Sequence, residues 1–257
     1  MNKEIVSVII PVYNGAKIIE TAIASVQMQT YSSLQIIVVD DGSEDDTYEI
    51  IEKIAREDQR ILLHRNKTNL GVVASRNWGC SKAVGRYIAF LDSDDRWYPE
   101  KIELQLNYLK QTKAHICYTS YEMIGKDDRG KAVQYIVPSE VDYKAILKEN
   151  CICCSSVLIH KDLLGSSPFS EGYFHEDFVL WLSLLKQGYR AVGIMECLMV
   201  YRLGGRSSDK INAMYYRWLI YRKHEHLSLL MTTYYFVCYG INGIRKYYLN
   251  NLGKLKQ

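Results

Sequence analysis

The chain has 257 residues, of which 48% are hydrophobic and 24% are charged, a composition typical of globular proteins that excludes a disordered or collagen-like chain. With roughly 150 residues in an average domain, this length predicts one large α/β domain with a tail. The net charge of +3 hides an asymmetry, because residues 201–257 contain ten Lys and Arg but only two Asp and Glu, which leaves −5 for residues 1–200. The two ends of the chain are therefore expected to meet different partners.

The number and spacing of the cysteines indicate the cellular compartment of the protein. They are seven in number and dispersed, and the N-terminus does not resemble a signal peptide, because Glu4 follows Lys3 and a strand-like run begins at once. We therefore expect the reducing cytosol. The cluster Cys151, Cys153 and Cys154 lacks the paired spacing of a zinc site, so we interpret these residues as small buried side chains.

The first half of the chain alternates β-branched runs with amphipathic stretches, a pattern typical of βα units around a parallel sheet. Buried strands are predicted at residues 6–12, 36–39, 61–63 and 87–91. Helices are predicted through residues 18–26, through residues 50–54 and over residues 72–83. Ser43 is a suitable N-cap for the second of these helices.

The second half mixes the two element types. Helices are predicted at residues 100–111 and 179–185, and extended segments at residues 116–123, 133–137, 156–159 and 195–202. The polar segment 125–131 is the expected tip of a hairpin. The region after about Asp209 is expected to be helical and separate from the rest.

Acidic residues follow two of the predicted strands. Asp40 and Asp41 come after the second strand, and Asp92, Asp94 and Asp95 come after the fourth. The carboxyl ends of such strands are where open α/β sheets bind ligands. Crowded carboxylates are unfavourable unless a cation or donor groups neutralise them, and oxygen ligands suit Mg²⁺ or Mn²⁺ together with a diphosphate. We therefore predict a metal role for Asp94, since helix capping requires a single side chain.

The sequence lacks the glycine-rich loops of dehydrogenases and P-loop NTPases after its strands. A metal would then have to hold the phosphates. The turn 69–71 precedes a helix in which Arg76 is available to a base or a phosphate. The alternative for Arg76 is a salt bridge on the surface.

Several ordered motifs resemble the inverting family-two glycosyltransferases of GT-A fold, over about residues 5–205. They are VSVIIPVYN, SVQMQTY, VVDDGSEDDT, NLGVVASRNWG, GRYIAFLDSDD with RWYPEK after it, and HEDFVLWLSLLKQG. The resemblance implies a Rossmann-like, mixed nucleotide-binding sheet flanked by helices. It also implies a catalytic domain at residues 1–205, with a nucleotide-sugar half at about residues 1–115 and an acceptor half at about 116–205, followed by a helical extension at 206–257. The closing segment is most similar to bacterial transferases that build O-antigen or capsule repeats on a lipid carrier.

The resemblance also implies binding residues for a UDP-sugar. Tyr13 would stack on the uracil, Asp41 would accept from its ring N–H, and Arg76 would lie near the base or ribose. Asp92 would reach the ribose or the metal, and Asp94 would coordinate Mn²⁺ or Mg²⁺ at the diphosphate. The full implied nucleotide-sugar set is Pro11, Tyr13, Asp41, Arg76, Asp92 and Ser93.

Asp177 of the HED motif is implied to be the general base of a direct displacement with inversion at the anomeric carbon. Glu176, His175 and Trp97 are candidate contacts of the acceptor. Structural roles stay open for three of these residues. Asp177 and Glu176 also suit a helix N-terminus, where negative charge is favourable, and His175 also suits a structural role. Trp181 is expected to pack rather than to stack on a sugar.

The C-terminal segment 227–244 is uncharged and rich in tyrosine but too polar for a convincing transmembrane helix. Flanking basic residues suit a helix at the surface of an anionic membrane. A pair of helices packed on the catalytic domain is an equal alternative. Nucleic acid is not expected as a partner, because no binding motif accompanies the charge.

Together these features predict transfer of a hexose from a UDP-sugar to an N-acetylhexosamine on undecaprenyl diphosphate, with β-1,3-glucosyl transfer as the leading possibility. The protein is expected to be cytoplasmic and peripheral at the inner face of a bacterial cell membrane. A sugar nucleotidyltransferase would need a glycine-rich loop where residues 11–14 stand. An inactive nucleotide-sugar-binding or scaffold subunit is the other alternative, against which the intact DxD and HED motifs argue. No pattern indicates an oligomeric state.

Overall fold

The computed structural model describes residues 4–125, 132–204 and 209–244. In this part of the chain, one mixed sheet has the strand order β3-β2-β1-β4-β9-β6-β10-β5, with β7 beside β6 and β8 beside β10. The strands are β1 (Val6–Val12), β2 (Leu34–Asp40), β3 (Ile61–Arg65), β4 (Tyr87–Phe90), β5 (Arg96–Trp97), β6 (Ile116–Ile124), β7 (Val133–Tyr135), β8 (Glu140–Val141), β9 (Leu158–His160) and β10 (Ala191–Arg202). The α-helices are α1 (Ile19–Gln27), α2 (Thr47–Glu57), α3 (Val72–Lys82), α4 (Lys101–Thr112), α5 (Tyr143–Lys148), α6 (Glu176–Lys186), α7 (Lys210–Leu219) and α8 (Leu229–Ile244).

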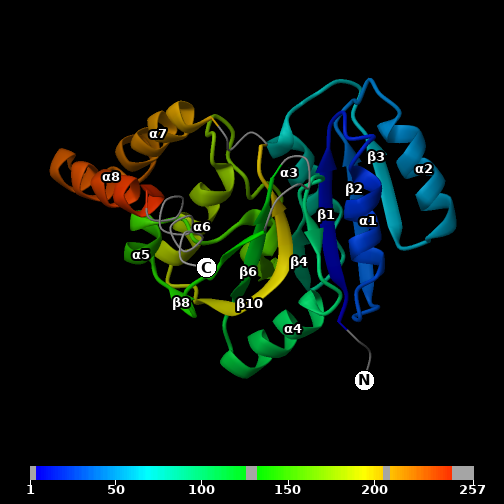
Figure 1. The fold of residues 1–257 in the computed structure, drawn as a ribbon, viewed down its shortest axis with the longest axis horizontal. Helices are drawn as coiled ribbons and strands as arrows, with labels where there is room; N and C mark the ends of the chain where they lie inside the picture. Colours follow the sequence, from blue (N-terminus) through cyan, green and yellow to red (C-terminus); the bar gives the residue numbers. More distant parts are fainter. Residues whose placement is uncertain (1–3, 126–131, 205–208, 245–257) are drawn as a thin grey trace, which may run out of the picture.

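The N-terminal strands form a parallel sheet with β1 at its centre. β1 pairs with β2 on one side and with β4 on the other, and β2 pairs with β3. The strands are added in one direction from β1 to β3, and β4 is then added on the other side of β1. Because crossovers between parallel strands are right-handed, this change places α3 on the face opposite α1 and α2 (Figure 1). A ligand crevice is therefore expected at the carboxyl ends of β1 and β4, the neighbouring strands at which the strand order reverses.

The approach of α3 to the sheet depends on a glycine. A Cβ atom added to Gly79 would lie 2.5 Å from the Cγ2 atom of Ile9 in β1. Only a residue without a side chain fits there, so α3 packs closely on β1. This contact fixes the position of Arg76, one turn earlier in the same helix.

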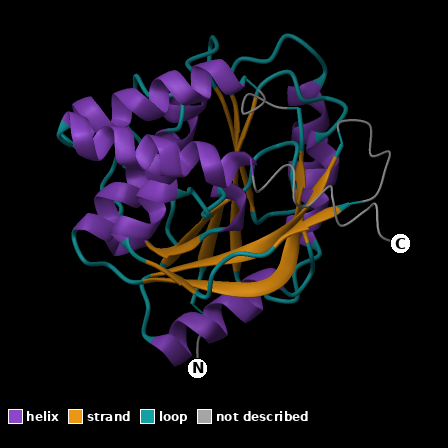
Figure 2. Cartoon of the chain, turned by 60° about the vertical axis from the view of Figure 1, so that its left-hand side comes forward, coloured by secondary structure: helices purple, strands orange, loops and turns teal. Residues whose placement is uncertain are grey.

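The C-terminal part of the sheet is attached through an antiparallel strand. β9 pairs in antiparallel fashion with both β4 and β6, and β10 then runs parallel to β6 with two register irregularities. Helix α4 contacts β6, β9 and β10. Viewed from a second direction, the strands lie between groups of helices (Figure 2).

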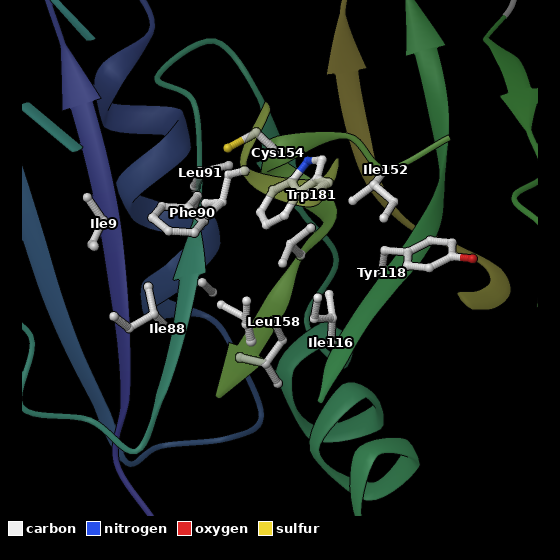
Figure 3. Close-up of a cluster of buried hydrophobic side chains, with 14 of the residues drawn as sticks. Ile9, Ile88, Phe90, Leu91, Ile116, Tyr118, Ile152, Cys154, Leu158 and Trp181 are labelled. Atoms are coloured by element: carbon white, nitrogen blue, oxygen red, sulfur yellow. The ribbon is translucent and has the colours of Figure 1, made fainter. Parts of the chain in front are cut away.

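One hydrophobic core joins the two parts of the sheet (Figure 3). Ile9 and Phe90 come from the parallel strands, whereas Leu158 comes from β9, and all three side chains are fully buried. Trp181 of α6 is fully buried in the same cluster. The expected packing role of Trp181 is therefore confirmed.

The C-terminal helices are packed on the rest of the protein, and the expectation of a separate region was wrong. Tyr221, in the π-helix Ile220–His224 between α7 and α8, is fully buried and donates its hydroxyl hydrogen to the carbonyl of Leu147. Glu225 accepts hydrogen bonds from Tyr143 and from Lys186 of α6. Helix α8 also contacts α5. The helical character of the region is confirmed, and its described part belongs to the same folded unit.

The shortest elements were not predicted. β5 and β8 have two residues each and α5 has six, which is too few for a periodic pattern. The antiparallel pairing of β6 with β7 confirms the predicted hairpin, whereas residues 126–131 of its expected tip lie outside the described residues. β10 begins at Ala191, earlier than predicted.

Candidate active site

A cavity of about 1030 Å³ lies where β1 and β4 end. Its sheet side is lined by residues that follow these strands, including Tyr13, Asp92 and Asp94. Its other side is formed by the start of α6 and by residues of α7 and α8. A smaller hollow of about 440 Å³ adjoins it and shares Tyr13 and Asn69. The cavity thus occupies the crevice that the sheet topology predicts.

Asp41 lines the cavity and also holds the turn before α3. Its Oδ1 atom accepts hydrogen bonds from the Asn66 side chain at 2.7 Å and from the Leu70 backbone at 2.9 Å, and its Oδ2 atom accepts from Gly71 at 2.8 Å. Gly71 has a φ angle of +89°, which glycine adopts without strain. A carboxylate has about four acceptor sites, so these three bonds leave room for one more, and the implied contact with uracil stays a prediction.

The five carboxylates expected at this edge of the sheet divide into two groups, because protein donors neutralise two of them. Asp40 accepts from the Ser43 backbone and pairs with Arg65. Asp95 is buried and accepts from the backbone of Arg202 on β10. Neither lines the cavity, whereas Asp41, Asp92 and Asp94 do. Asp92 and Asp94, the residues predicted to hold a metal, therefore remain the candidates for that role.

Arg76 of α3 forms two ion pairs inside the protein, one with a residue that follows β4 and one with the first residue of α6. Its Nη2 atom is 2.5 Å from Oδ1 of Asp92, and its Nη1 atom is 2.6 Å from Oε1 of Glu176. The side chain is 4% exposed, so the alternative of a surface salt bridge was wrong. Its implied place near the base or ribose stays a prediction, because both interactions are with carboxylates of the protein.

Glu176 is buried and its carboxylate binds Arg76. This ion pair holds the Glu176 carboxylate in place at the start of α6, and because Glu176 also lines the cavity, its contact with an acceptor stays a prediction. Removing one partner of such a buried pair costs about 3–5 kcal/mol, since it leaves an uncompensated charge.

Asp177 is the next residue of α6 and lines the cavity. Its Oδ1 atom accepts a hydrogen bond from the Phe178 backbone at 2.7 Å. Burial, followed by the negative charge of Glu176, raises the pKa of Asp177 to about 6, although Arg76 opposes the shift. A carboxylate with a pKa close to neutral is suited to general-base catalysis.

Asp92 and Asp94 fit a divalent cation. Burial, followed by the charge of Asp92, raises the pKa of Asp94, and a cation bound at these carboxylates would relieve their repulsion. The described residues contain no cluster of three or more metal-ligating side chains. Mg²⁺ commonly uses only one or two carboxylates and takes its other ligands from phosphates and water, so this donor set suits a metal bound together with a diphosphate.

Two further expectations for the acceptor side have different outcomes. Trp97 is 4% exposed, donates its indole hydrogen to the Ser155 carbonyl and does not line the cavity. Stacking of Trp97 on an acceptor sugar is therefore corrected to a packing role beneath the site. His175 lines the cavity, with its ring 5.0 Å from that of Phe174, so an acceptor contact stays a prediction.

Sequence reasoning missed the contribution of the C-terminal helices to the cavity. Arg217 of α7 lines it together with Tyr239, Asn242 and Gly243 of α8. The sequence held a signal, since an arginine lies among aromatic residues there, but only the long-range packing of α8 on α5 places these side chains. Cys153 and Cys154 also line the wall, and burial raises the pKa of both thiols well above the usual range.

Comparison with known proteins agrees with this geometry. The model of the family described as Glycosyl transferase family 2 matches residues 7–163. TuaG of Bacillus subtilis, named as a teichuronic acid biosynthesis glycosyltransferase, is 35% identical over 95% of this chain and 98% of its own. WfaP of Escherichia coli, named as a UDP-Glc:alpha-D-GlcNAc-diphosphoundecaprenol beta-1,3-glucosyltransferase, is 36% identical over 95% of this chain and 96% of its own.

Among solved structures, TarS 1–349 of S. aureus in complex with UDP-GlcNAc has a TM-score of 0.68 at 21% identity, covering 98% of this chain and 75% of that chain. The mixed sheet, its flanking helices and this likeness define the GT-A fold. The chain belongs to glycosyl transferase family 2.

Proposed function

We propose that this glycosyltransferase transfers a hexose, with glucose as the leading candidate, from a UDP-sugar to an N-acetylhexosamine on undecaprenyl diphosphate. The product would be a β-1,3-linked intermediate of O-antigen or capsular polysaccharide. The names of WfaP and of WfgD, which is 33% identical over 96% of this chain, support this choice of donor and acceptor. The observation that carries the proposal is the placement of Asp177 in one cavity with Asp92 and Asp94.

The donor would lie along the ends of β1 and β4. Tyr13 is 43% exposed and lines both the cavity and the adjoining hollow, a position suited to stacking on uracil. The backbone N–H of Asp41 donates to the carbonyl of Val12, which holds Asp41 beside Tyr13. Pro11 and Ser93 line the same side of the cavity and would complete the nucleotide-sugar site.

Asp177 would act on the acceptor. Its carboxylate removes the proton from the attacking hydroxyl, whose oxygen bonds to the anomeric carbon as the bond from that carbon to the diphosphate breaks. The nucleoside diphosphate leaves on the opposite face, so the configuration inverts. Arg76 and Glu176 hold α6 against β4 and so keep this base at a fixed distance from the donor.

Mn²⁺ or Mg²⁺ would be held by Asp94 and Asp92. When bound, such an ion neutralises negative charge on a diphosphate leaving group. The GT-A mannosyltransferase PcManGT of Pyrobaculum calidifontis was solved in complex with GDP-Man and Mn²⁺ and has a TM-score of 0.67 at 18% identity, covering 87% of this chain and 64% of that one. In this chain, the placement of Asp92 and Asp94 in one cavity supports a cation there.

An anionic membrane surface is the proposed location, at the cytoplasmic face of the cell membrane. One face of α8 carries Leu230, Tyr234, Val237, Ile241 and Ile244 at helical spacing, each between 50% and 81% exposed. The 13 residues after Ile244 add four basic residues and no acidic one, each basic residue contributing about 1 kcal/mol near an anionic surface. Among the described helices, none has the length and hydropathy to cross a bilayer.

Sedimentation with anionic liposomes tests this location. The double variant Leu230→Glu/Val237→Glu should lose binding, because charges replace two exposed apolar side chains of α8. Val84→Glu is the matched control, since Val84 is 66% exposed far from α8 in the sequence. Undiminished binding of the double variant, or no binding of the unaltered chain, would contradict the membrane surface.

A donor and acceptor screen tests the reaction itself. The purified chain, Mn²⁺ or Mg²⁺ and a panel of UDP-, GDP- and dTDP-sugars are incubated with a lipid-diphosphate N-acetylglucosamine or N-acetylgalactosamine. We expect UDP release and a product one hexose heavier with a single UDP-sugar. UDP binding without transfer to either acceptor would contradict the proposed acceptor and favour an inactive binding subunit.

A further inference from the structure

Arg217 is a buried cation whose hydrogen-bonding capacity is not filled by the protein. It lines the cavity from α7 and is 2% exposed. Within the described residues, its Nε and Nη1 atoms are buried and have no hydrogen-bond partner. The guanidinium does have one hydrogen bond, with the Tyr221 side chain, but leaving its other buried donors without acceptors is unfavourable. Its position is explained if an anion enters the cavity.

Two aromatic rings hold the guanidinium group. Its central carbon lies 3.5 Å from the centroid of the Phe178 ring and 4.6 Å from that of the Tyr239 ring. Aromatic rings attract the faces of a guanidinium group, whereas its N–H donors lie in the plane between those faces. These contacts therefore restrict the side chain while leaving in-plane donors for a ligand.

The location of Arg217 separates it from the donor side. Phe178 directly follows the candidate base Asp177 in α6, and Tyr239 belongs to α8. Arg76, on the sheet side of the cavity, is already paired with Asp92 and Glu176. Arg217 thus lies over the residue that follows the candidate base and beside α8, whose opposite face is apolar.

The space around Arg217 is open on the side of α8. Asn242 and Gly243 line the cavity there, and in the described part of the chain a Cβ atom added to Gly240 or Gly243 would meet no atom outside its own helix within 4 Å. A ligand group larger than a water molecule can therefore approach along this helix. The exposed apolar residues of α8 lie on the same helix and suit a hydrocarbon chain.

We propose that Arg217 binds a phosphate of the acceptor's lipid-linked diphosphate. The inference rests on the proposed function, which it deepens by assigning the anionic part of the acceptor to a residue. Guanidinium groups match the geometry of phosphate oxygens. A sugar attached to that diphosphate would extend from Arg217 toward Asp177, and the lipid would leave along α8.

Two acceptors and three variants test this site. The acceptors are N-acetylglucosamine α-linked through a diphosphate to a short alkyl chain, and the same sugar as a phosphate-free alkyl glycoside. Arg217→Gln should lower kcat/KM for the diphosphate acceptor by about 10- to 100-fold, the loss expected for one charge-assisted hydrogen bond, without changing kcat/KM for the glycoside. Arg217→Lys should retain part of the activity, and Lys223→Gln, which removes an exposed charge nearby, should behave as the unaltered chain.

The other outcomes separate the possible roles. An equal loss on both acceptors together with a lower melting temperature would make Arg217 a packing residue and overturn the proposal. A weaker affinity for UDP in Arg217→Gln would assign it to the donor and overturn it as well. If the unaltered chain transfers to neither acceptor, the proposed function fails, whereas calorimetric binding of the diphosphate acceptor, expected to disappear in Arg217→Gln, still decides the phosphate site.

Discussion

Arg76→Met tests whether the buried ion bridge positions α6. The substitution leaves Glu176 buried without its cation and removes the link to Asp92, for which we expect a loss of about 3–5 kcal/mol in the free energy of unfolding. In a chain of this size each kcal/mol corresponds to a shift of about 2–4 °C. The melting temperature should therefore fall by roughly 10 °C.

Urea unfolding and thermal denaturation measure this effect, and a double-mutant cycle isolates it. Arg76→Met and Glu176→Gln combined should cost less than the sum of the two single changes, because the second removes the charge that the first leaves unpaired. Arg56→Met is the control: its partner is Glu52, both side chains are exposed, and such a pair contributes only about 0.5 kcal/mol. An Arg76→Met protein with unaltered stability but weaker UDP affinity would refute the positioning role and favour a nucleotide contact.

Two predictions concern the chemistry. Because the pKa of Asp177 is raised to about 6 and a general base acts when deprotonated, kcat should fall about tenfold per pH unit as the pH drops below that value; a pH-rate profile flat to pH 4.5 would speak against Asp177 as the base. Asp94→Ala should abolish the dependence of UDP affinity on Mn²⁺, measured by calorimetry with and without chelator, and unchanged metal dependence would remove Asp94 from the metal site.

The parallel half of the fold was predictable because its signals are local. β1 is a continuous apolar run and is buried over its whole length, and the acidic residues directly after β2 and β4 indicate the ligand-binding edge. The register of β1 with β2, in which Val12 is opposite Asp40, then brings Tyr13 close to Asp41. Each of these inferences needs only one strand and its next residues.

The remaining parts of the site depend on partners far away in sequence. Asp94 and Asp95 are neighbours, yet Asp95 is turned away because it accepts from Arg202, 107 residues later. The sequence likewise gave no reason for Trp97 to donate to Ser155, or for Arg217 to lie over Phe178. Tertiary packing therefore decides which of several chemically similar side chains line the cavity.

The most direct test of the proposed reaction is a comparison of turnover and donor affinity in Asp177→Asn. The amide has nearly the shape of the carboxylate but cannot accept the proton, so we predict a kcat lowered by about 10²-fold or more with UDP affinity retained. Turnover close to that of the unaltered chain would contradict the assignment of Asp177 as the general base.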